Sequence, residues 1–429
     1  MNKRVSPTLV IAFALALVTL VPRIAKADPA APLQSLTLAQ AAERARDASF
    51  DVRTAIEAAH VAHADAATAR SGLRPQIAIS ATALDANASQ LGMPVAAQAY
   101  AAITASLPLL TPALGPTVRA SAISADAAAT DIDAARNDAF FVAIAAYRRA
   151  QLTTAIVETR AEAIRDQGAH LNVTGVRVRA GKLPRYLLAR DRAALALAQQ
   201  SREDAAADRD EAINDLAVTL ALDLAAPPQI VTPLEAAALD GTLEHFLDRA
   251  LAQAPFVLGA QLRENAARSS LVAARGAYAP TAMLTAQTYN GGSSPHLGAA
   301  GGQIALVVSL PIIDGGTRAA AEERARATVA QAHVMLEKAR ASTERDVRNA
   351  WRDVQSARSN LATAQSVVAD AAESLRIARV REAAGKGIEL EILDALAVAA
   401  TAREGIVKSL VRFDLAVAAL HHATGDLTL

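Results

Sequence analysis

A pair of carboxylates near the C-terminal end of the chain has the residue type and spacing to act on cations. Glu391 and Asp394 are three residues apart, so a helix beginning near residue 388 places both on one face. Carboxylates gathered in this way attract cations. Acidic side chains near the start of a helix are also favoured by the helix dipole. The sequence leaves both interpretations open.

Two glycine–lysine pairs stand at matching places, 204 residues apart. They are Gly181 with Lys182, and Gly385 with Lys386. A glycine directly after a long helical segment is typical of the position where the backbone turns left-handed and the helix ends. We therefore predict a tight chain reversal at each pair, with Glu391 and Asp394 just beyond the second one.

No residue pattern indicates catalysis. The chain has no cysteine, no G-x-S-x-G elbow, no H-E-x-x-H pair and no phosphate-binding G-x-x-x-x-G-K-[ST] loop. The glycine-rich stretch 290–302 contains no lysine and joins two predicted strands, so we interpret it as a surface loop. The sequence predicts neither an enzyme nor a bound cofactor.

The histidines give no clear metal motif. His421 and His422 are adjacent and point to different faces of a helix. His60 and His63 share a helical face but have no cluster of acidic residues near them. We interpret all four as ordinary helix-surface residues and predict no metal site.

The composition indicates a helical protein without a thick core. Hydrophobic residues make up 52% of the 429 residues and aromatic residues only 3%, so most of the apolar content is alanine, valine and leucine. Such chains pack helices closely. The 43 basic residues balance the 43 acidic ones, which argues against a nucleic-acid partner.

The first 27 residues are typical of an export signal. Lys3 and Arg4 precede an apolar run over 9–21, and an A-x-A cleavage site ends at Ala27. A membrane anchor is the alternative, although the run is shorter than the ~20 residues that a spanning helix needs. Because there is no cysteine, lipid attachment through an N-terminal cysteine is not expected.

A heptad repeat organises the second half of the chain. Between Gly316 and Gly385 there is no proline or glycine, and apolar residues recur every seven positions on two interleaved phases. Such a pattern predicts a coiled-coil seam in a helix on the order of 100 Å long. The seam residues are Val347, Val354, Leu361, Val368 and Leu375, interleaved with Ala350, Ala357, Ala364, Ala371 and Ala378.

The chain is built from two similar repeats, because residues such as Thr37, Arg70 and Pro75 recur 205 positions later as Thr242, Arg275 and Pro280. A connector over 227–241 separates the first repeat, 28–226, from the second, 242–429. Helices are predicted over 37–71, 113–179 and 184–222, and over 242–276, 316–384 and 388–424. Strands with alternating apolar and polar residues are predicted over 76–85, 99–107, 281–289 and 302–310.

The four predicted strands have the length of tilted membrane-crossing strands. Four strands cannot close a barrel, and a spanning sheet must have no open edge. If these strands cross a membrane, further copies of the chain must complete the barrel. Two copies give eight strands and three give twelve, and the spacing does not choose between them.

With these elements in place, the chain resembles the TolC-type outer-membrane efflux protein family over about residues 36–426. The motifs that carry the resemblance are Leu36, Thr37, Leu38 and Ala41 at the start, A-R-x-x-x-x-P before the first strand of each repeat, S-L-P-I-I-D-G-G over 309–316, and Thr424, Gly425 and Asp426 near the end.

The resemblance implies a mixed α/β membrane protein in which a long antiparallel coiled-coil α-barrel continues a transmembrane β-barrel. It also implies a homotrimer, in which four strands from each chain give a barrel of twelve strands. It also implies three partners: outer-membrane lipid, an inner-membrane transporter, and a periplasmic adaptor (membrane fusion protein) that docks at the tip turns Gly181, Lys182, Gly385 and Lys386. Glu391 and Asp394 would then line the periplasmic pore gate.

Two functions of different classes follow. The first is the outer-membrane channel of a tripartite efflux or secretion system, a passive duct across the periplasm. The second is a periplasmic coiled-coil adaptor or spacer without a membrane barrel, which would be soluble without detergent. The sequence favours the channel, and it does not indicate the exported substrate or the particular pump.

Overall fold

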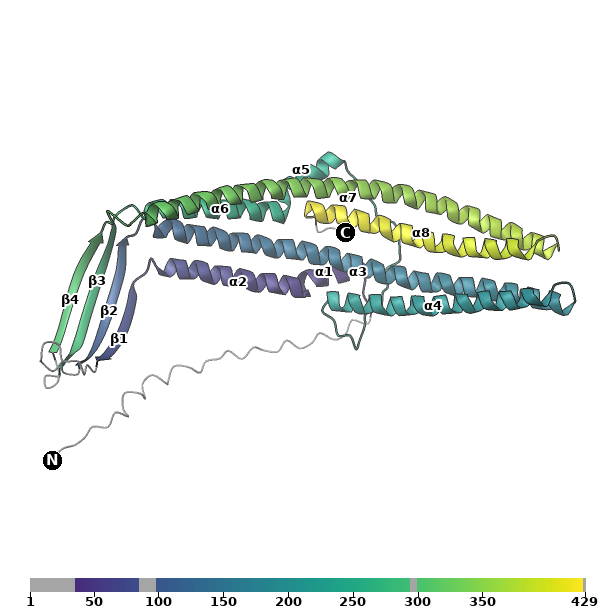
Figure 1. Ribbon diagram of the computed structural model, residues 1–429, viewed down its shortest axis with the longest axis horizontal. Helices are drawn as coiled ribbons and strands as arrows, with labels where there is room; N and C mark the ends of the chain where they lie inside the picture. The colour runs from purple at the N-terminus through teal and green to yellow at the C-terminus, as the bar shows by residue number, and fades with distance from the viewer. Residues whose placement is uncertain (1–34, 85–97, 294–298, 427–429) are drawn as a thin grey trace, which may run out of the picture.

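The computed structural model describes residues 35–84, 98–293 and 299–426. The predicted leader, 1–27, lies outside them. The described chain is elongated, with a sheet at one end and two helical tips at the other (Figure 1). The long helices α3 (Leu114–Arg179) and α7 (Thr317–Ala383) run through most of this length.

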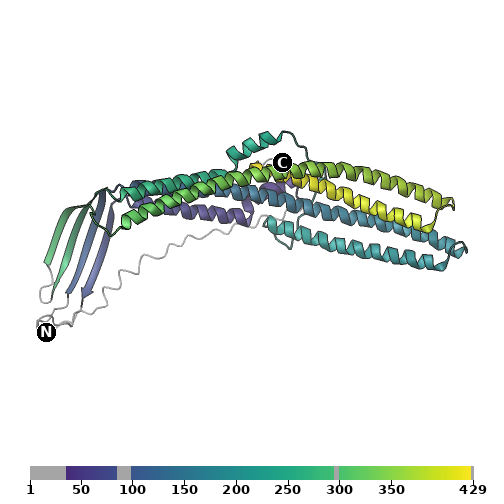
Figure 2. The same ribbon diagram turned by 45° about the horizontal axis from the view of Figure 1, so that its top comes forward.

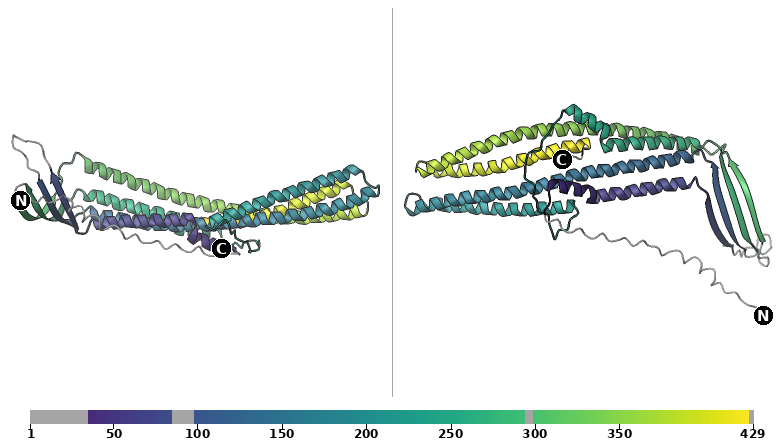
Figure 3. Two further views of the ribbon diagram at one scale, coloured as in Figure 1. Left: turned by 90° about the horizontal axis from the view of Figure 1, so that it is seen from below. Right: turned by 180° about the vertical axis from the view of Figure 1, so that it is seen from behind.

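Two successions of helix, helix, strand, strand, helix, helix make up the fold. The first is α1 (Leu38–Ala48), α2 (Phe50–Ser71), β1 (Gln76–Leu84), β2 (Gln98–Leu110), α3 and α4 (Arg185–Thr219). The second is α5 (Leu243–Gln253), α6 (Pro255–Gly276), β3 (Thr281–Ser293), β4 (Ala299–Ser309), α7 and α8 (Glu389–Thr424). Figure 3 shows α2 and α6 beside the sheet-side halves of α3 and α7, and α4 and α8 beside the tip-side halves.

The structure breaks two segments that the sequence predicts as single helices. Over 37–71, Ser49 is extended (φ −60°, ψ 149°), ends α1 and accepts a hydrogen bond from the Val52 amide at 3.3 Å to begin α2. Over 242–276, Ala254 is extended and Pro255 begins α6. A serine cap and a proline at the first helical position both start new helices, so each segment is two helices.

Three of the four strands, β2, β3 and β4, are longer than predicted. β2 continues from the expected end at residue 107 to Leu110 and passes through Pro108, where its register with β3 shifts. A proline is tolerated at such an irregularity because the missing N–H is not needed there. β3 and β4 extend into the stretch that the sequence assigns to a loop, reaching Ser293 and Ala299.

The four strands of the described residues form one antiparallel sheet in the order β1-β2-β3-β4 (Figure 2). Directly paired residues share a face of the sheet. One face carries the rows Ile77–Ala105–Ala286–Ile304 and Leu107–Leu284–Leu306. The opposite face carries the rows Gln76–Ser106–Thr285–Ala305 and Ala78–Thr104–Gln287–Gln303. The sheet therefore has one apolar and one mostly polar face.

The heptad seam is buried between α7 and α8. Val347, Val354 and Leu375 are 0%, 1% and 3% exposed, and they pack in clusters that include Ile392 and Phe413 of α8. Alanine at the alternate layers lets the two helix backbones lie close. Ala364 and Val368 depart from this pattern and are only half-buried.

A core at mid-length joins α1, α3, α4 and the connector. Tyr147 is fully buried, donates a hydrogen bond from its hydroxyl to the Leu36 carbonyl at 2.8 Å, and accepts one from the Thr232 amide at 3.1 Å. Leu36 also pairs with Ile230. The connector is thus fastened to the start of the described chain. Within the described ranges, no helix combines the length and apolarity of a membrane-crossing segment.

Candidate functional site: the helical tips and the hairpin interface

Both tip turns have the glycine geometry that the sequence predicts. Gly181 and Gly385 have φ angles of 71° and 70°, the left-handed conformation in which a side chain is strained. The amide of Lys182 donates to the Arg177 carbonyl at 2.8 Å, and that of Lys386 donates to the Arg381 carbonyl at 2.9 Å. Both lysine side chains are exposed. The turns join α3 to α4 and α7 to α8 at the end remote from the sheet (Figure 1).

Glu391 and Asp394 lie on the same side of α8, as their spacing predicts. Together with Asp370 and Glu373 of α7 they line a groove of about 420 Å³. Glu391 is 3.0 Å from the Arg381 guanidinium, whereas Asp394 is exposed and makes no ion pair within the described part of the chain. A hydrogen bond from Arg376 lowers the pKa of Glu373. The groove is therefore rich in carboxylates, some of them already neutralised.

The two helical hairpins, α3–α4 and α7–α8, meet near the tips through charged side chains. Asp166 of α3 contacts Arg379 of α7 at 2.6 Å and Arg403 of α8 at 3.1 Å. Arg160 of α3 contacts Glu404 of α8 at 3.0 Å. Partly exposed ion pairs hold helices far less firmly than an apolar seam does. The contact between hairpins is thus weaker than the contact within each hairpin.

Glu404 is held ionised by its partners. Burial raises its pKa, but hydrogen bonds from Arg160 and Lys408 outweigh this effect and lower the pKa below its ordinary value. Nearer the middle, the same pair of helices has a buried ion pair, Arg148 with Asp414 at 3.0 Å. There burial dominates and raises the pKa of Asp414, despite the Ala237 amide and Arg148 beside it.

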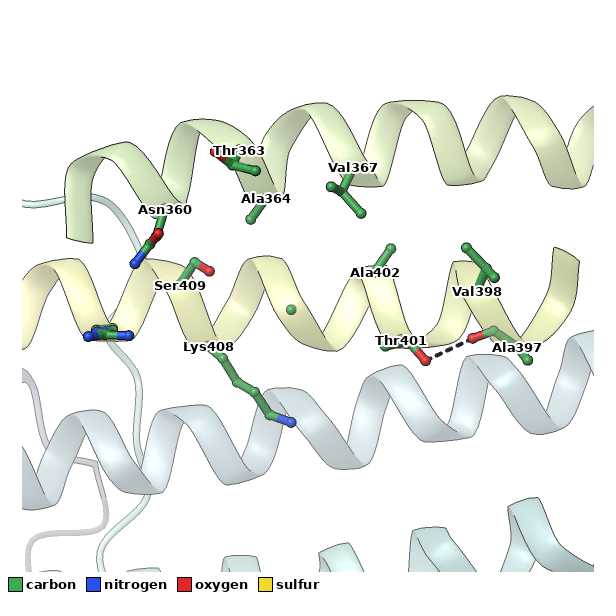
Figure 4. Close-up of a pocket in the computed structure, with 12 residues that line it drawn as sticks. Asn360, Thr363, Ala364, Val367, Ala397, Val398, Thr401, Ala402, Lys408 and Ser409 are labelled. Carbon is green, nitrogen blue, oxygen red and sulfur yellow. Dashed lines mark hydrogen bonds between the residues drawn. The ribbon is translucent and has the colours of Figure 1, made fainter. Parts of the chain in front are cut away.

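A shallow groove interrupts the α7–α8 seam at its half-buried layer (Figure 4). It has a volume of about 680 Å³ and is lined from α7 by Asn360, Thr363, Ala364 and Val367, and from α8 by residues that include Val398, Ala402 and Ser409. Lys408 points away from α7. Small side chains and Gly405 leave the gap, and even a Cβ atom at position 405 would meet no other atom within 4 Å.

A buried histidine that the sequence analysis did not single out lies between the hairpins. The His170 Nε2 atom of α3 is 2.6 Å from Glu389 Oε1 of α8 and 3.5 Å from Asp191 Oδ2 of α4. These residues are up to 219 positions apart, so no local spacing could have indicated them. The histidines that the sequence did consider have separate neighbours: Glu57 for His60, Asp426 for His421 and Asp138 for His422.

Comparison with known proteins supports the resemblance to efflux channels. Residues 246–426, most of the second repeat, match the family model described as outer membrane efflux protein. Comparison with curated proteins gives no match.

Solved structures share the fold over most of the chain. The Campylobacter jejuni CmeC outer membrane channel is 17% identical with a TM-score of 0.80, covering 90% of this chain and 85% of its own. A membrane protein from Pseudomonas aeruginosa is 19% identical, with a TM-score of 0.79 and coverage of 90% and 93%. The open state of the Neisseria gonorrhoeae MtrE outer membrane channel is 22% identical, with a TM-score of 0.76 and coverage of 91% and 89%.

Proposed function

We propose that this chain, whose second repeat matches the outer membrane efflux protein family and whose fold is that of outer-membrane channels, is itself an outer-membrane channel. It would act as the passive export duct of a tripartite efflux or secretion system. The observation that carries the proposal is the apolar face of the four-stranded sheet, which no other described part of the chain covers.

The apolar face has the character of a lipid-facing surface. Ile79 and Ile304 are 77% and 79% exposed, and Leu306 and Val308 are exposed beside them. A soluble protein would normally bury a contiguous patch of this kind. Strands of 9 to 13 residues at ~3.3 Å per residue are long enough to cross a bilayer at a tilt. We infer that the apolar face contacts outer-membrane lipid and the polar face lines a lumen.

The sheet needs other copies to close. Among the described residues, β1 pairs only with β2 and β4 only with β3, so the two outer strands have free edges. Unpaired backbone groups are too costly in lipid, and spanning sheets close into barrels of at least eight strands. We propose a homotrimer with a twelve-stranded barrel, the assembly that the resemblance implies.

The tips would form the regulated end of the duct. In a trimer, Glu391 and Asp394 would surround the axis as a carboxylate ring that favours cations. The pairing of Glu391 with Arg381 leaves Asp394 as the stronger contributor of charge. The exposed turns at Gly181, Lys182, Gly385 and Lys386 would dock a periplasmic adaptor, which connects the channel to an inner-membrane transporter.

Single cysteines test the lipid-facing surface, because the chain has none of its own. We would introduce Ile79→Cys on the apolar face and, as the matched control, Ser80→Cys on the opposite face of the same strand. Each is labelled with an environment-sensitive fluorophore in lipid vesicles containing brominated acyl chains. We expect strong quenching at position 79 and weak quenching at position 80.

Equal quenching at the two positions would contradict the proposed membrane sheet. Recovery of the wild-type protein as a water-soluble monomer, without detergent, would also contradict it and would favour the periplasmic spacer. Channel conductance is then recorded in planar bilayers. A lower preference for cations in Asp394→Asn would support the assignment of Asp394 to the gate, and an unchanged preference would contradict it.

A further inference from the structure

Four helices bring a buried polar cluster together beside the Gly385 turn. His170 comes from α3, Asp191 from α4, Glu382 from the end of α7 and Glu389 from the start of α8. Both hairpins therefore contribute to it. The side chains of His170, Asp191 and Glu389 are 3%, 0% and 10% exposed, so the cluster is closed to bulk water.

The cluster leaves Asp191 without compensation. Both of its carboxylate oxygens are buried and make no hydrogen bond in the described structure, although Oδ2 faces His170 Nε2. A buried carboxylate without hydrogen bonds is costly. Three carboxyl groups surround the site, and among the described residues one guanidinium forms an ion pair with them, that of Arg177, 3.9 Å from Glu382. A cation between Asp191 and its neighbours would compensate these carboxylates.

The donor atoms form the set that a divalent metal ion uses. One imidazole nitrogen and two carboxylate oxygens, from His170, Asp191 and Glu389, lie within 4.8 Å of one another. We propose that these three residues bind a divalent transition-metal ion, with Zn²⁺ the best match, and that the ion joins the two hairpins at the tips. Mixed nitrogen and oxygen ligands with three protein donors are typical of zinc, and a water would supply the fourth ligand.

The surrounding groups orient the ligands as a metal site requires. His170 Nδ1, the nitrogen not used for the metal, is 3.2 Å from Glu382 Oε1. A carboxylate on the far nitrogen fixes the orientation of a ligating histidine and makes it a stronger donor. The Thr174 hydroxyl donates to Glu389 Oε1 at 3.1 Å, and Arg177 donates to the Glu382 main-chain carbonyl. Glu389 is thus already held by a hydrogen bond, whereas His170 Nδ1 and Glu382 Oε1 face each other without one.

Only a small adjustment separates this arrangement from a bound ion. In a tetrahedral zinc site, nitrogen and oxygen donors are about 3.4 Å apart. The His170–Asp191 separation of 3.5 Å already fits. The 2.6 Å between His170 and Glu389 is a hydrogen bond, which must open as the metal replaces the shared proton. Asp191 can move toward the ion freely, because it has no hydrogen bond to lose.

A bound ion would hold the tips closed. The ligands span α3, α4 and α8, so separating the hairpins would break metal–ligand bonds rather than partly exposed ion pairs. This consequence rests on the proposed channel function, whereas metal binding itself does not. The test therefore measures binding first, in detergent solution, where channel activity plays no part.

We would titrate Zn²⁺ into the full-length mature protein, purified with a tag that contains no histidine, by isothermal calorimetry and thermal unfolding. One saturable site per chain and an increase in Tm are expected. Asp191→Asn and His170→Gln should each weaken binding by more than about 100-fold, and Glu382→Gln by about 10- to 100-fold. His60→Gln, which alters an exposed histidine 3.3 Å from a carboxylate on α2, should leave the affinity unchanged.

The variant His170→Cys distinguishes the loss of a metal ligand from loss of binding through misfolding. A thiolate also binds these metals, so the Co²⁺ form of this variant should gain a thiolate-to-metal charge-transfer band that the wild type lacks. No saturable site in the wild type would overturn the proposal. Equal loss of affinity in His60→Gln, or a His170→Cys variant that folds without the band, would overturn it as well.

Discussion

Asp166 offers the most direct test of whether the tips open by separation of the two hairpins, as expected if they are the regulated end of the proposed duct. It is the single α3 carboxylate that contacts both helices of the other hairpin, at 2.6 Å to Arg379 and 3.1 Å to Arg403. Its side chain is 25% exposed, and those of the two arginines are 48% and 33% exposed. Replacing Asp166 by Asn keeps its size and removes its charge, leaving two guanidinium groups facing each other.

The magnitude follows from the exposure of these pairs. A partly exposed ion pair contributes about 0.2–1 kcal/mol, so the two together hold the hairpins by about 0.4–2 kcal/mol in each chain. Arg403 keeps a weaker contact with Glu162 at 3.7 Å, which favours the lower part of this range. Since about 1.4 kcal/mol is a factor of ten, Asp166→Asn should raise the open-to-closed ratio by about 2- to 30-fold per chain.

Single-channel recording in planar bilayers measures this ratio. The matched control is Glu344→Gln, because Glu344 pairs with Arg348 one turn away on the same helix, at 2.8 Å and with similar exposure, and lies outside the carboxylate groove. In the wild type, raising the salt from about 0.1 to 1 M should act like the substitution, since ions screen partly exposed pairs. An unchanged open probability in Asp166→Asn, or an equal increase in Glu344→Gln, would show that the ion pairs of Asp166 do not hold the hairpins together.

Two further predictions concern stability. The lowered pKa of Glu404 contributes stability that is present above its unfolded pKa near 4.5 and is lost as the pH falls through the folded pKa. Glu404→Gln should therefore lower the unfolding midpoint at pH 7, and its midpoint should differ less from that of the wild type toward pH 3. A difference in midpoint that stays constant with pH would contradict the role of Arg160 and Lys408. Gly385→Ala should destabilise the protein by about 1 kcal/mol, because Gly385 has a φ of 70°. Gly168→Ala, inside α3 with no atom within 4 Å of the added Cβ, should stabilise the protein by about 0.5–1 kcal/mol. Thermal unfolding measures whether each variant is more or less stable than the wild type.

Periodicity along the chain was enough to predict most of the helical framework. The seven-residue repeat through Val347 and Leu375 predicts one long helix with a narrow apolar stripe, and both residues are buried against α8. The structure differs at Ala364 and Val368, which are half-buried. A repeat in one helix does not reveal that the facing helix has small residues and Gly405 at that level.

The breaks within the predicted helices and strands depend on single residues, and the effect of each residue depends on the backbone conformation around it. Serine at position 49 is compatible with a helix interior, and only the extended backbone found there makes it a cap. Pro108 predicts the end of a strand when only the local sequence is considered, yet the register shift in the sheet accommodates it. Local sequence therefore located the elements better than it located their breaks.

The two repeats could be predicted from the sequence because residues 205 positions apart match directly. The coiled-coil seam, the glycine turns at the tips and the apolar–polar alternation of the strands could be predicted because each depends on residues within a turn or two of one another, where backbone geometry decides which face a side chain occupies. The tertiary structure alone decided that Asp166 bridges the hairpins, that Glu391 is paired with Arg381, and that His170, Asp191 and Glu389 meet in a closed cluster. These contacts join separate helices, in part more than 200 residues apart along the chain, and their distances follow from how the hairpins pack rather than from any spacing within them.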